Sequence, residues 1–341
     1  RNAGSGFQPL NLKRSYEDIS PERLVKDIMF KDPAYLDMIY GDAMEAVSSA
    51  SRHWIMAEEG YRIMAGDFVS VEAVVLACLA GEQWKIDAFR AGEKIYERMA
   101  DKIYGYPTVT KATHPAERFD GKTGELAFGY QGALGAWRNF DRTDRHTDER
   151  VIEICRAWRA EHPEITKLWR SLNSAAISAV RDNKETIYRD IGFAPVDDWL
   201  AMILPNGKHI WYYQPLLSKR MPRWHDPATE EACTCKCEME HVLSYMSMKN
   251  GQWTRIYTYG GKLAENATQA TSREILMPAA RRLERHGYTP VLTVYDEVVC
   301  EVPEGLGSLK EFEEIMIAQP EGWYASWPLS VDGWEGYRYK K

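Results

Sequence analysis

Acidic residues stand at two places where short apolar segments end. Asp67 follows the apolar segment 61–65, and Asp296 and Glu297 lie at the tip of the apolar hairpin 291–302. Carboxylates at strand ends are held firmly and stay accessible to ligands. If the two segments are neighbours in a sheet, Asp67 and Asp296 can share two Mg²⁺ ions, which take oxygen ligands and lie about 3.5–4 Å apart in two-metal sites. Taken alone, each acid is more simply an ordinary turn residue.

A second pattern, one that can bind a phosphorylated ligand, lies between residues 118 and 132. Arg118, Lys122, Leu126 and Tyr130 recur every four residues, which places them on one face if the segment is helical. The two cations can bind a triphosphate, and the aromatic ring can contact a base. Glycines in the segment weaken a helix but allow close approach of a substrate or of another helix. The alternative is a solvent-exposed helix face that ends in a tyrosine.

The apolar periodicity indicates an α+β protein that positions these residues. We expect strands at 61–65, 253–259, 291–294 and 298–302. We expect helices over about 33–59, over much of 70–137, after Thr147, from Pro163 onward and over 261–286. Segments 199–204 and 208–213 flank Pro205-Asn206-Gly207, which is a hairpin signal.

Three motifs carry a resemblance to a known family. Asp67-Phe-Val-Ser-Val-Glu72 resembles motif A of family A DNA polymerases, the bacterial DNA polymerase I type. Residues 118–132 resemble motif B in the Glu-Leu-Ala-x-Gly-Tyr style of bacteriophage members, and Tyr295-Asp296-Glu297 resembles motif C. The flanking segments 1–11, 52–57, 95–105 and 257–274 also resemble family segments. The resemblance covers most of the chain, and its motifs occur in the family's order.

The resemblance implies a set of catalytic and metal-binding residues. Asp67 and Asp296 would ligate two Mg²⁺ ions, for which Mn²⁺ can substitute, with help from the backbone carbonyl of Phe68. Glu297 would give acidic support near the primer end. Lys122 would bind the incoming triphosphate and protonate the departing pyrophosphate, since a cation beside a developing phosphate charge stabilises it.

The same resemblance implies binding residues for the nucleotide and for the DNA. Tyr130 would stack near the templating base, and Glu72 would crowd a ribose 2′-hydroxyl and so favour deoxynucleotides. The nucleotide-binding set is Arg118, Lys122, Leu126, Tyr130, Glu72 and Tyr96. The primer-template-binding set is Arg1, Gln8, Asn11, Arg52, Asn266, Gln269 and Arg273. For the stripe formed by Lys262, Asn266, Gln269 and Arg273, a solvated helix face is the alternative.

Four positions depart from the family pattern. Tyr295 and Tyr96 stand where many relatives have histidine, so an imidazole role is in doubt at both. Leu126 occupies an aromatic position, so tolerance of dideoxynucleotides does not follow. Gln131 follows Tyr130 where a glycine is usual.

The implied architecture is a polymerase right hand with an antiparallel palm sheet and a mostly helical fingers subdomain. We expect residues 1–80 to form the first part of the palm, 81–252 the fingers with an inserted hairpin and cysteine loop, and 253–341 the second part of the palm. The thumb and exonuclease domain of relatives precede this region. We therefore expect an N-terminal portion on a longer chain or on a separate subunit.

Composition restricts the possibilities only weakly. The net charge of −7 does not favour a nucleic-acid binder, although a basic groove can lie on an acidic body. Cys233, Cys235 and Cys237 can bind zinc with His225 or His241, but a surface loop is the simpler interpretation. No apolar run reaches the length of a membrane span. We expect a cytoplasmic protein of a bacterial host cell if the chain is phage-encoded.

The predicted function is template-directed DNA polymerisation, in which a primer 3′-hydroxyl attacks a dNTP and pyrophosphate leaves. The expected partners are primer-template DNA and dNTPs. The alternative is a catalytically inactive DNA-binding or scaffold relative, which the presence of Asp67, Asp296 and Lys122 disfavours. A metal nuclease would also need paired carboxylates but would not explain Lys122 with Tyr130. A single-subunit RNA polymerase is disfavoured by Glu72.

Overall fold

The structure is a computed structural model that describes residues 12–13, 15–16, 18–105, 108–143, 145–220, 239–318 and 322–339. The chain divides into two compact units. Unit 1 contains residues 1–71, 273–320 and 329–341, and unit 2 contains residues 72–272 and 321–328. These boundaries differ from those expected at 80/81 and 252/253. The assignment of the units to palm and fingers stays a prediction.

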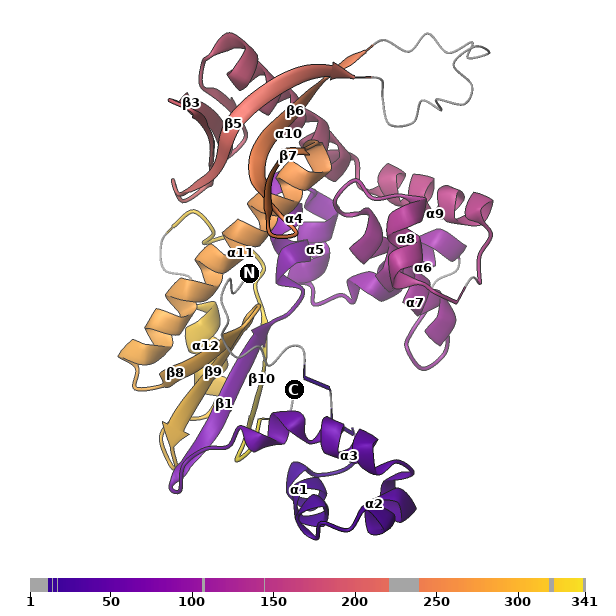
Figure 1. Cartoon of the computed structure of the whole chain (residues 1–341), viewed down its shortest axis with the longest axis vertical. Helices are drawn as coiled ribbons and strands as arrows, with labels where there is room; N and C mark the ends of the chain where they lie inside the picture. Colours follow the sequence, from indigo (N-terminus) through magenta and orange to yellow (C-terminus); the bar gives the residue numbers. More distant parts are fainter. Residues whose placement is uncertain are drawn as a thin grey trace. The chain divides into compact units, whose positions relative to one another are not determined.

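Unit 1 is built on a four-stranded antiparallel sheet in the order β10-β1-β9-β8 (Figure 1). The strands are β1 (Tyr61–Phe68), β8 (Thr289–Val294), β9 (Glu297–Pro303) and β10 (Val331–Gly336). One face packs against α12 (Leu309–Ile317), and the other buries Ile63, Ala65 and Val299 together with Tyr339. The unit also contains α1 (Pro21–Met29), α2 (Pro33–Tyr40), α3 (Ala43–Ser49) and the 3₁₀ helix η2 (Ser51–Trp54).

Unit 2 begins with a series of helices. They are α4 (Val71–Ala80), α5 (Gln83–Arg90), α6 (Ile95–Tyr104), α7 (Pro115–Phe128), α8 (Leu134–Phe140), α9 (Asp148–Glu161) and α10 (Pro163–Asp182). Local sequence explains several ends: the Thr147 side chain caps α9, Pro163 occupies the first turn of α10, and Asn183 ends α10 in the left-handed conformation. Helix α11 (Gly260–Arg285) contributes residues to both units.

A six-stranded antiparallel sheet completes unit 2, in the order β2-β3-β4-β5-β6-β7. Its strands are β2 (Thr186–Tyr188), β3 (Ile191–Val196), β4 (Trp199–Ile203), β5 (His209–Arg220), β6 (Glu240–Lys249) and β7 (Gln252–Tyr257). The predicted hairpin around Asn206 is confirmed as β4 and β5. The sequence predicted a hairpin and a loop before residue 253, and the structure adds β2, β3 and β6 to the same sheet, in which each strand pairs with the next along the chain.

None of the described helices combines the length and the apolar character that crossing a membrane would require.

Candidate active site

The end of β1 lies beside the turn between β8 and β9. The strand register places Asp67 opposite Glu297, and the N–H of Phe68 donates a 3.2 Å hydrogen bond to the carbonyl oxygen of Asp296. Tyr295 forms the turn with φ of +55°, a left-handed conformation that few residues other than glycine adopt. The prediction that the two acid-bearing strands are sheet neighbours is confirmed.

Asp67 lies on the face of the sheet opposite α12, the face that also buries Tyr339. The preceding residue, Gly66, faces α12 so closely that a Cβ there would lie 2.5 Å from the Met316 sulfur. Because successive strand residues point to opposite faces, Asp67 points away from α12. Burial raises the pKa of the Tyr339 hydroxyl, and the charges of Glu297 and Asp67 raise it further, which places Asp67 near Tyr339. Asp67 and Asp296 are both half-buried.

Glu297 occupies a different environment from the two aspartates. Its side chain is buried, with 2% of the residue exposed. One carboxylate oxygen accepts a 2.6 Å hydrogen bond from the Tyr339 hydroxyl, and the other accepts a 3.3 Å bond from the Trp334 indole. These contacts hold Glu297 within the sheet's packed face. Its predicted role near a primer end stays a prediction.

The carboxylate oxygens at this turn suit a hard cation such as Mg²⁺, whose remaining ligands would be water and substrate oxygens. No group of three or more His, Cys, Asp or Glu side chains within the described ranges is placed to hold a metal ion. The backbone contacts bring two aspartates, Asp67 and Asp296, to one end of the sheet. Mg²⁺ is often held by one or two carboxylates, with water and substrate phosphates as its remaining ligands. The residues present therefore fit Mg²⁺.

In unit 2, helix α7 carries the predicted triphosphate-binding cations. Arg118 Nε lies 3.4 Å from a Glu97 carboxylate oxygen, and its guanidinium lies 5.8 Å from the centre of the Tyr96 ring. Lys122 and Leu126 are exposed. Within the described part of the chain, the Lys122 ammonium has no hydrogen-bond or ion-pair partner. Lys122 is thus the more available of the two cations for an added anion.

The prediction that Tyr130 continues the same helical face is wrong. Helix α7 ends at Phe128, with Gly129 as its C-cap, and Gln131 has φ of +64°. The chain therefore leaves the helical course after Gly129, with a left-handed residue directly after Tyr130. Four-residue spacing alone did not reveal where the helix stops.

Tyr130 instead meets two other predicted site residues. Its hydroxyl donates a 3.1 Å hydrogen bond to Glu72 of α4, and Gln269 of α11 also hydrogen-bonds to the Glu72 side chain. Glu72 is accessible to solvent, yet surrounding protein atoms desolvate its carboxylate and raise its pKa. Burial and the neighbouring Glu72 charge also raise the pKa of Tyr130 well above its usual value. Three segments distant in sequence thus form one polar cluster.

The inner side of α7 rests on a buried ionic network that sequence reasoning missed. Glu125 accepts hydrogen bonds from Lys85 of α5 and, at 3.0 Å, from the Trp158 indole of α9. His162 Nε2 lies 3.3 Å from the Glu125 carboxylate, and its other ring nitrogen contacts the Trp158 carbonyl oxygen at 2.7 Å. Burial favours a higher pKa for Glu125, but Lys85 and His162 outweigh it and lower the pKa to about 2. The only signal in the sequence for this network was the position of Glu125 between a glycine and apolar residues, which indicates a buried acid.

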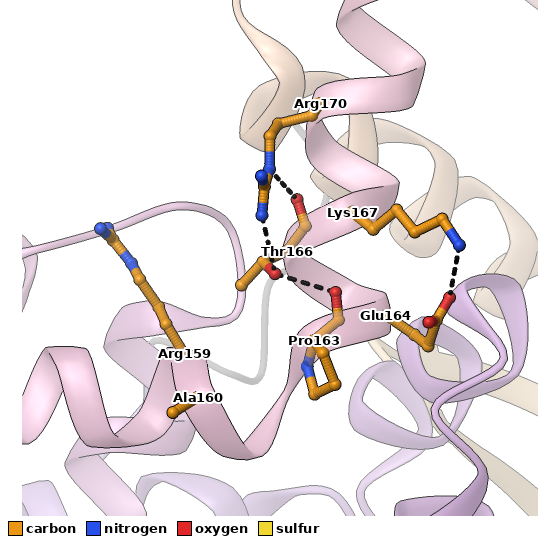
Figure 2. A pocket seen from close by; sticks show the side chains of 7 residues that line it. All are labelled: Arg159, Ala160, Pro163, Glu164, Thr166, Lys167 and Arg170. Carbon is orange, nitrogen blue, oxygen red and sulfur yellow. Dashed lines mark hydrogen bonds and ion pairs between the residues drawn. The ribbon is translucent and has the colours of Figure 1, made fainter.

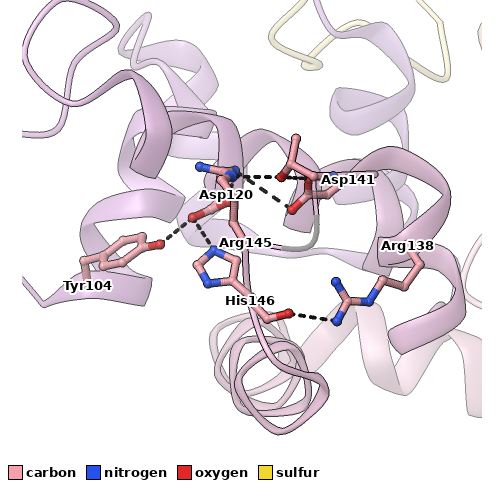
Figure 3. Close-up of polar contacts among 7 residues, drawn as sticks. Tyr104, Asp120, Arg138, Asp141, Arg145 and His146 are labelled. Atoms are coloured by element: carbon pink, nitrogen blue, oxygen red, sulfur yellow. Dashed lines mark hydrogen bonds and ion pairs between the residues drawn. The ribbon is translucent and has the colours of Figure 1, made fainter.

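A second missed cluster attaches the segment after α8 to α7. Asp120 is almost fully buried and accepts hydrogen bonds from Tyr104, from Arg145 at 2.7 Å and from His146 at 2.8 Å. Figure 3 shows these side chains converging on Asp120. Asp120 and Glu125 therefore fix the inner side of α7 and leave Lys122 on its outer side.

Close approach of backbones explains several glycines near this cluster. A Cβ on Gly121 would lie 2.1 Å from the Tyr96 carbonyl oxygen of α6, and one on Gly261 would lie 2.2 Å from the Tyr130 carbonyl oxygen. The Gly261 N–H also donates a 2.9 Å hydrogen bond to the Gln131 side chain. Gln131, where the family pattern has glycine, thus joins the start of α11 to the segment after α7.

The predicted DNA-binding residues are only partly placed. On α11, Asn266 donates a 3.0 Å hydrogen bond to the Tyr212 hydroxyl, while Gln269 and Arg273 are exposed. Arg52 is buried and donates two hydrogen bonds to the Leu12 carbonyl oxygen, at 3.2 and 2.9 Å. The remaining predicted contacts, Arg1, Gln8 and Asn11, lie outside the described residues. So do Cys233, Cys235 and Cys237, and the zinc alternative stays untested.

A basic pocket lies where α9 meets α10. Arg159, Lys167 and Arg170 line it together with Ala160, Pro163, Glu164 and Thr166, as Figure 2 shows. Thr166 accepts hydrogen bonds from Arg170, and Lys167 lies 3.5 Å from Glu164. Arg159 also donates a 3.0 Å bond to the Gly132 carbonyl oxygen. The pocket wall is thereby joined to the segment that follows Tyr130.

Comparison with known proteins bears on these features. The chain is 33% identical over 308 residues to a DNA polymerase of Bacillus phage SP02, a match that covers 90% of this chain and 45% of that protein. Its fold is similar to that of the POL domain of Pol1 from M. smegmatis in complex with DNA primer-template and dNTP. The TM-score is 0.55 at 17% identity, over 87% of this chain and 43% of that one.

Two predictions from the sequence are confirmed by these matches: the resemblance to DNA polymerases and the α+β polymerase fold. No family model matches the chain. The chain spans less than half the length of the phage relative.

Proposed function

We propose that this chain carries the polymerase region of a family A DNA polymerase and adds deoxynucleotides to a primer 3′-hydroxyl under the direction of a template. The observation that carries the proposal is the hydrogen bond from Phe68 to Asp296, which together with the β1–β9 register brings two acid-bearing segments to one sheet end. The similarity to the DNA polymerase of Bacillus phage SP02 supports it.

In this proposal unit 1 supplies the acidic residues that the reaction needs. Asp67 and Asp296, with the carbonyl oxygen of Phe68, would hold two Mg²⁺ ions, for which Mn²⁺ can substitute. Bound metal ions would lower the pKa of the attacking hydroxyl and stabilise the negative charge that develops on the phosphate. The left-handed turn at Tyr295 holds Asp296 at the strand end, and Glu297 fixes the turn from beneath through Tyr339 and Trp334.

Unit 2 would bind the nucleotide. Lys122, exposed and without a partner among the described residues, would bind the triphosphate and donate a proton to the leaving pyrophosphate. Arg118 would add a second cation, and Tyr96 beside it a hydroxyl donor. Tyr130 would stack near the templating base, with Leu126 on the exposed side of α7. A tyrosine hydrogen bond holds the Glu72 carboxylate in place, which suits a side chain that crowds a ribose 2′-hydroxyl.

The DNA would be bound by residues on several segments. Gln269 and Asn266 of α11 would read acceptors in the minor groove that all base pairs share, so that they test geometry and not sequence. Arg273 and Arg52, with Arg1, Gln8 and Asn11, would complete the set. We further propose a role in phage DNA replication in the cytoplasm of a bacterial host, with a thumb and exonuclease portion on a longer chain or another subunit.

Primer extension on one gel tests the proposal. A labelled primer annealed to a longer template should lengthen with dNTPs and Mg²⁺, and far less with rNTPs. Asp67→Asn should abolish lengthening while DNA binding persists, because the amide keeps the side-chain shape and loses the charge. Binding without lengthening by the unmodified chain would identify a scaffold, a shortened primer would identify a nuclease, and equal use of rNTPs would identify an RNA polymerase.

A further inference from the structure

The six-stranded sheet of unit 2 has two unlike faces. Helix α10 packs against one of them, where Phe193, Leu200, Met202 and Tyr212 are buried. Figure 1 shows α10 beside β3, β5 and β6, and the Thr186 hydroxyl donates a 2.9 Å hydrogen bond to the Ala175 carbonyl oxygen of α10. Because strand residues alternate, the residues between these buried ones point to the opposite face.

That opposite face carries a continuous series of aromatic rings, which we call the aromatic row: Trp211, Trp199, Tyr213 and Trp253. The register places Trp199 opposite Tyr213, so both lie on one face, with Trp211 two residues along β5. Ring centres lie 6.3 Å apart from Trp211 to Trp199, 4.6 Å from Trp199 to Tyr213 and 6.0 Å from Tyr213 to Trp253. The three tryptophans are 38–54% exposed.

Exposed tryptophans require a reason, because burying such rings is strongly favourable. The pairing within the row does not bury them. Tyr213, whose ring is nearest to Trp199, is only half-buried. Ala201, which pairs with Trp211, is a small residue on the same face and is buried. The row therefore presents flat, accessible π faces on a rigid sheet.

Two arginines lie beside the aromatic row. On the face of the row, strands β5, β6 and β7 carry Arg220 and Arg255 and one acid, Glu240, which pairs with Arg220, while Lys219 and Lys249 lie on the opposite face. Arg220 lies 3.6 Å from the centre of the Tyr257 ring, and Arg255 donates a 2.9 Å hydrogen bond to the Gln214 carbonyl oxygen. Both arginines lie on the same face as the row.

We propose that the aromatic row is a binding surface for single-stranded nucleic acid, with unpaired bases stacked on the rings and phosphates beside Arg220 and Arg255. Aromatic rings on an open sheet face, flanked by cations, bind single strands with little sequence preference, because every base has a π face. A protein partner would need an apolar surface with acids placed to pair with Arg220 and Arg255. The inference goes beyond polymerisation, since it concerns strand binding by a surface to which the proposed function assigns no role.

Fluorescence anisotropy with a fluorescein-labelled oligo(dT) of about 12 nucleotides tests the proposal. The full chain is titrated with excess unlabelled blunt DNA hairpin present, so that sites for duplex DNA are already filled. Stacking of one base contributes roughly 1–3 kcal/mol, so Trp211→Ala and Trp253→Ala should each weaken binding by about fivefold to a hundredfold. Trp211→Phe, which keeps a ring, should bind within about threefold of the unmodified chain.

A matched control and a salt titration complete the experiment. Phe140→Ala removes a ring that is 49% exposed on α8 of the same unit and should leave oligo(dT) binding unchanged. Arg220→Gln should reduce the slope of log K against log salt by about 0.7, the value for one phosphate contact on a single strand. Equal binding by all variants would overturn the proposal in favour of a protein-docking face. An equal loss in Phe140→Ala would also overturn it.

Primer extension with the same variants separates this inference from the proposed function. Trp211→Ala should still extend a primer on a template whose overhang is a single nucleotide. If the unmodified chain binds oligo(dT) through the aromatic row but never extends a primer, the proposed function fails and this inference stands. If extension occurs and the variants of the aromatic row bind oligo(dT) normally, this inference fails and the proposed function stands.

Discussion

Two buried glutamates lie beside predicted site residues, one in each unit, and they are held in different ways. In unit 1, Glu297 accepts hydrogen bonds from the Tyr339 hydroxyl and the Trp334 indole, and the strand register fixes it next to Asp67. In unit 2, Glu125 joins Lys85 and His162, residues on three separate segments. Unit 1 thus positions its acids chiefly by backbone pairing, whereas unit 2 positions its cations by buried side-chain charges.

This difference predicts different sensitivities to substitution. A sheet register survives the loss of one side chain, because the backbone hydrogen bonds remain. A buried ionic network does not survive in the same way, because removing one member leaves the others desolvated and unpaired.

The largest effect is expected for Glu125→Ala. This substitution leaves Lys85 buried, with 1% of its side chain exposed, beside His162 and without its carboxylate. Breaking a buried pair in this way costs about 3–5 kcal/mol of folding stability. Chemical denaturation followed by circular dichroism measures the loss. Glu153→Ala, an exposed helix acid paired with Arg150, is the control and should cost less than about 1 kcal/mol. A similar cost for both would contradict the role assigned to the network.

Lys122→Ala should have the next largest effect, on activity and not on folding. If Lys122 binds the triphosphate as proposed, its loss should lower kcat/KM for dNTP by about a hundredfold to a thousandfold, the usual cost of removing one group that stabilises transition-state charge. Its exposed side chain contributes little to stability, so the unfolding midpoint should not change. Lys111→Ala, another exposed lysine of unit 2, is the comparison. Steady-state incorporation of one nucleotide provides the measurement.

Acid should weaken unit 2 through the same network, but less than Glu125→Ala does, because protonation keeps the side chain and part of its hydrogen bonding. The pKa of Glu125 is lowered to about 2 in the folded chain, below the ordinary value of 4.5. Its stabilising contribution is therefore fully present above pH 4.5 and is lost as the pH falls from 4.5 through about 2. Denaturant midpoints measured across this range should fall more steeply for the unmodified chain than for Glu125→Gln.

The sequence predicted the backbone-built half of the site better than the side-chain-built half. Short apolar segments that end in Asp67 and Asp296 were sufficient to predict neighbouring strands, because strand ends and tight turns leave local signals. The partners of Glu125 come from positions 85 and 162, and no periodicity relates such distant residues. The end of α7 was also missed, because it depends on the left-handed Gln131, which the start of α11 holds in place.

The sheet of unit 2 was underestimated for a related reason. The turn sequence Pro205-Asn206-Gly207 predicts one hairpin. The pairings that join the other strands to this hairpin leave no comparable signal in the sequence. In the sequence, Trp199, Trp211 and Tyr213 alternate with apolar residues. Which of the two sets lies on the exposed face could be assigned only from the structure, in which α10 covers the other face.

Gly121→Ala tests a smaller effect in unit 2. The added methyl group would lie 2.1 Å from the Tyr96 carbonyl oxygen, a backbone atom that cannot move without displacing α6. Overpacking of this kind costs about 1–3 kcal/mol, which exceeds the gain in helix propensity. Gly135→Ala is the matched control on α8, where no atom lies within 4 Å of the new methyl group, and it should be neutral or stabilising. Equal thermal midpoints for the two variants would show that α6 and α7 pack less tightly.

The smallest effect is expected in unit 1, for Tyr339→Phe. The substitution removes the hydroxyl that donates a 2.6 Å hydrogen bond to Glu297 but keeps the ring that packs against Ala65 and Val299. Because the Trp334 indole and the β1–β9 register remain, we expect a cost of about 1–2 kcal/mol, at the lower end for an unsatisfied buried acceptor. Burial and Glu297 raise the pKa of this hydroxyl, so it is neutral and donating at every pH at which the chain is normally studied. The loss should therefore be independent of pH between 6 and 9, unlike that of Glu125 in acid. A loss as large as that of Glu125→Ala would mean that unit 1, like unit 2, depends on side-chain charge to hold its acids, and the contrast between the two halves would no longer hold.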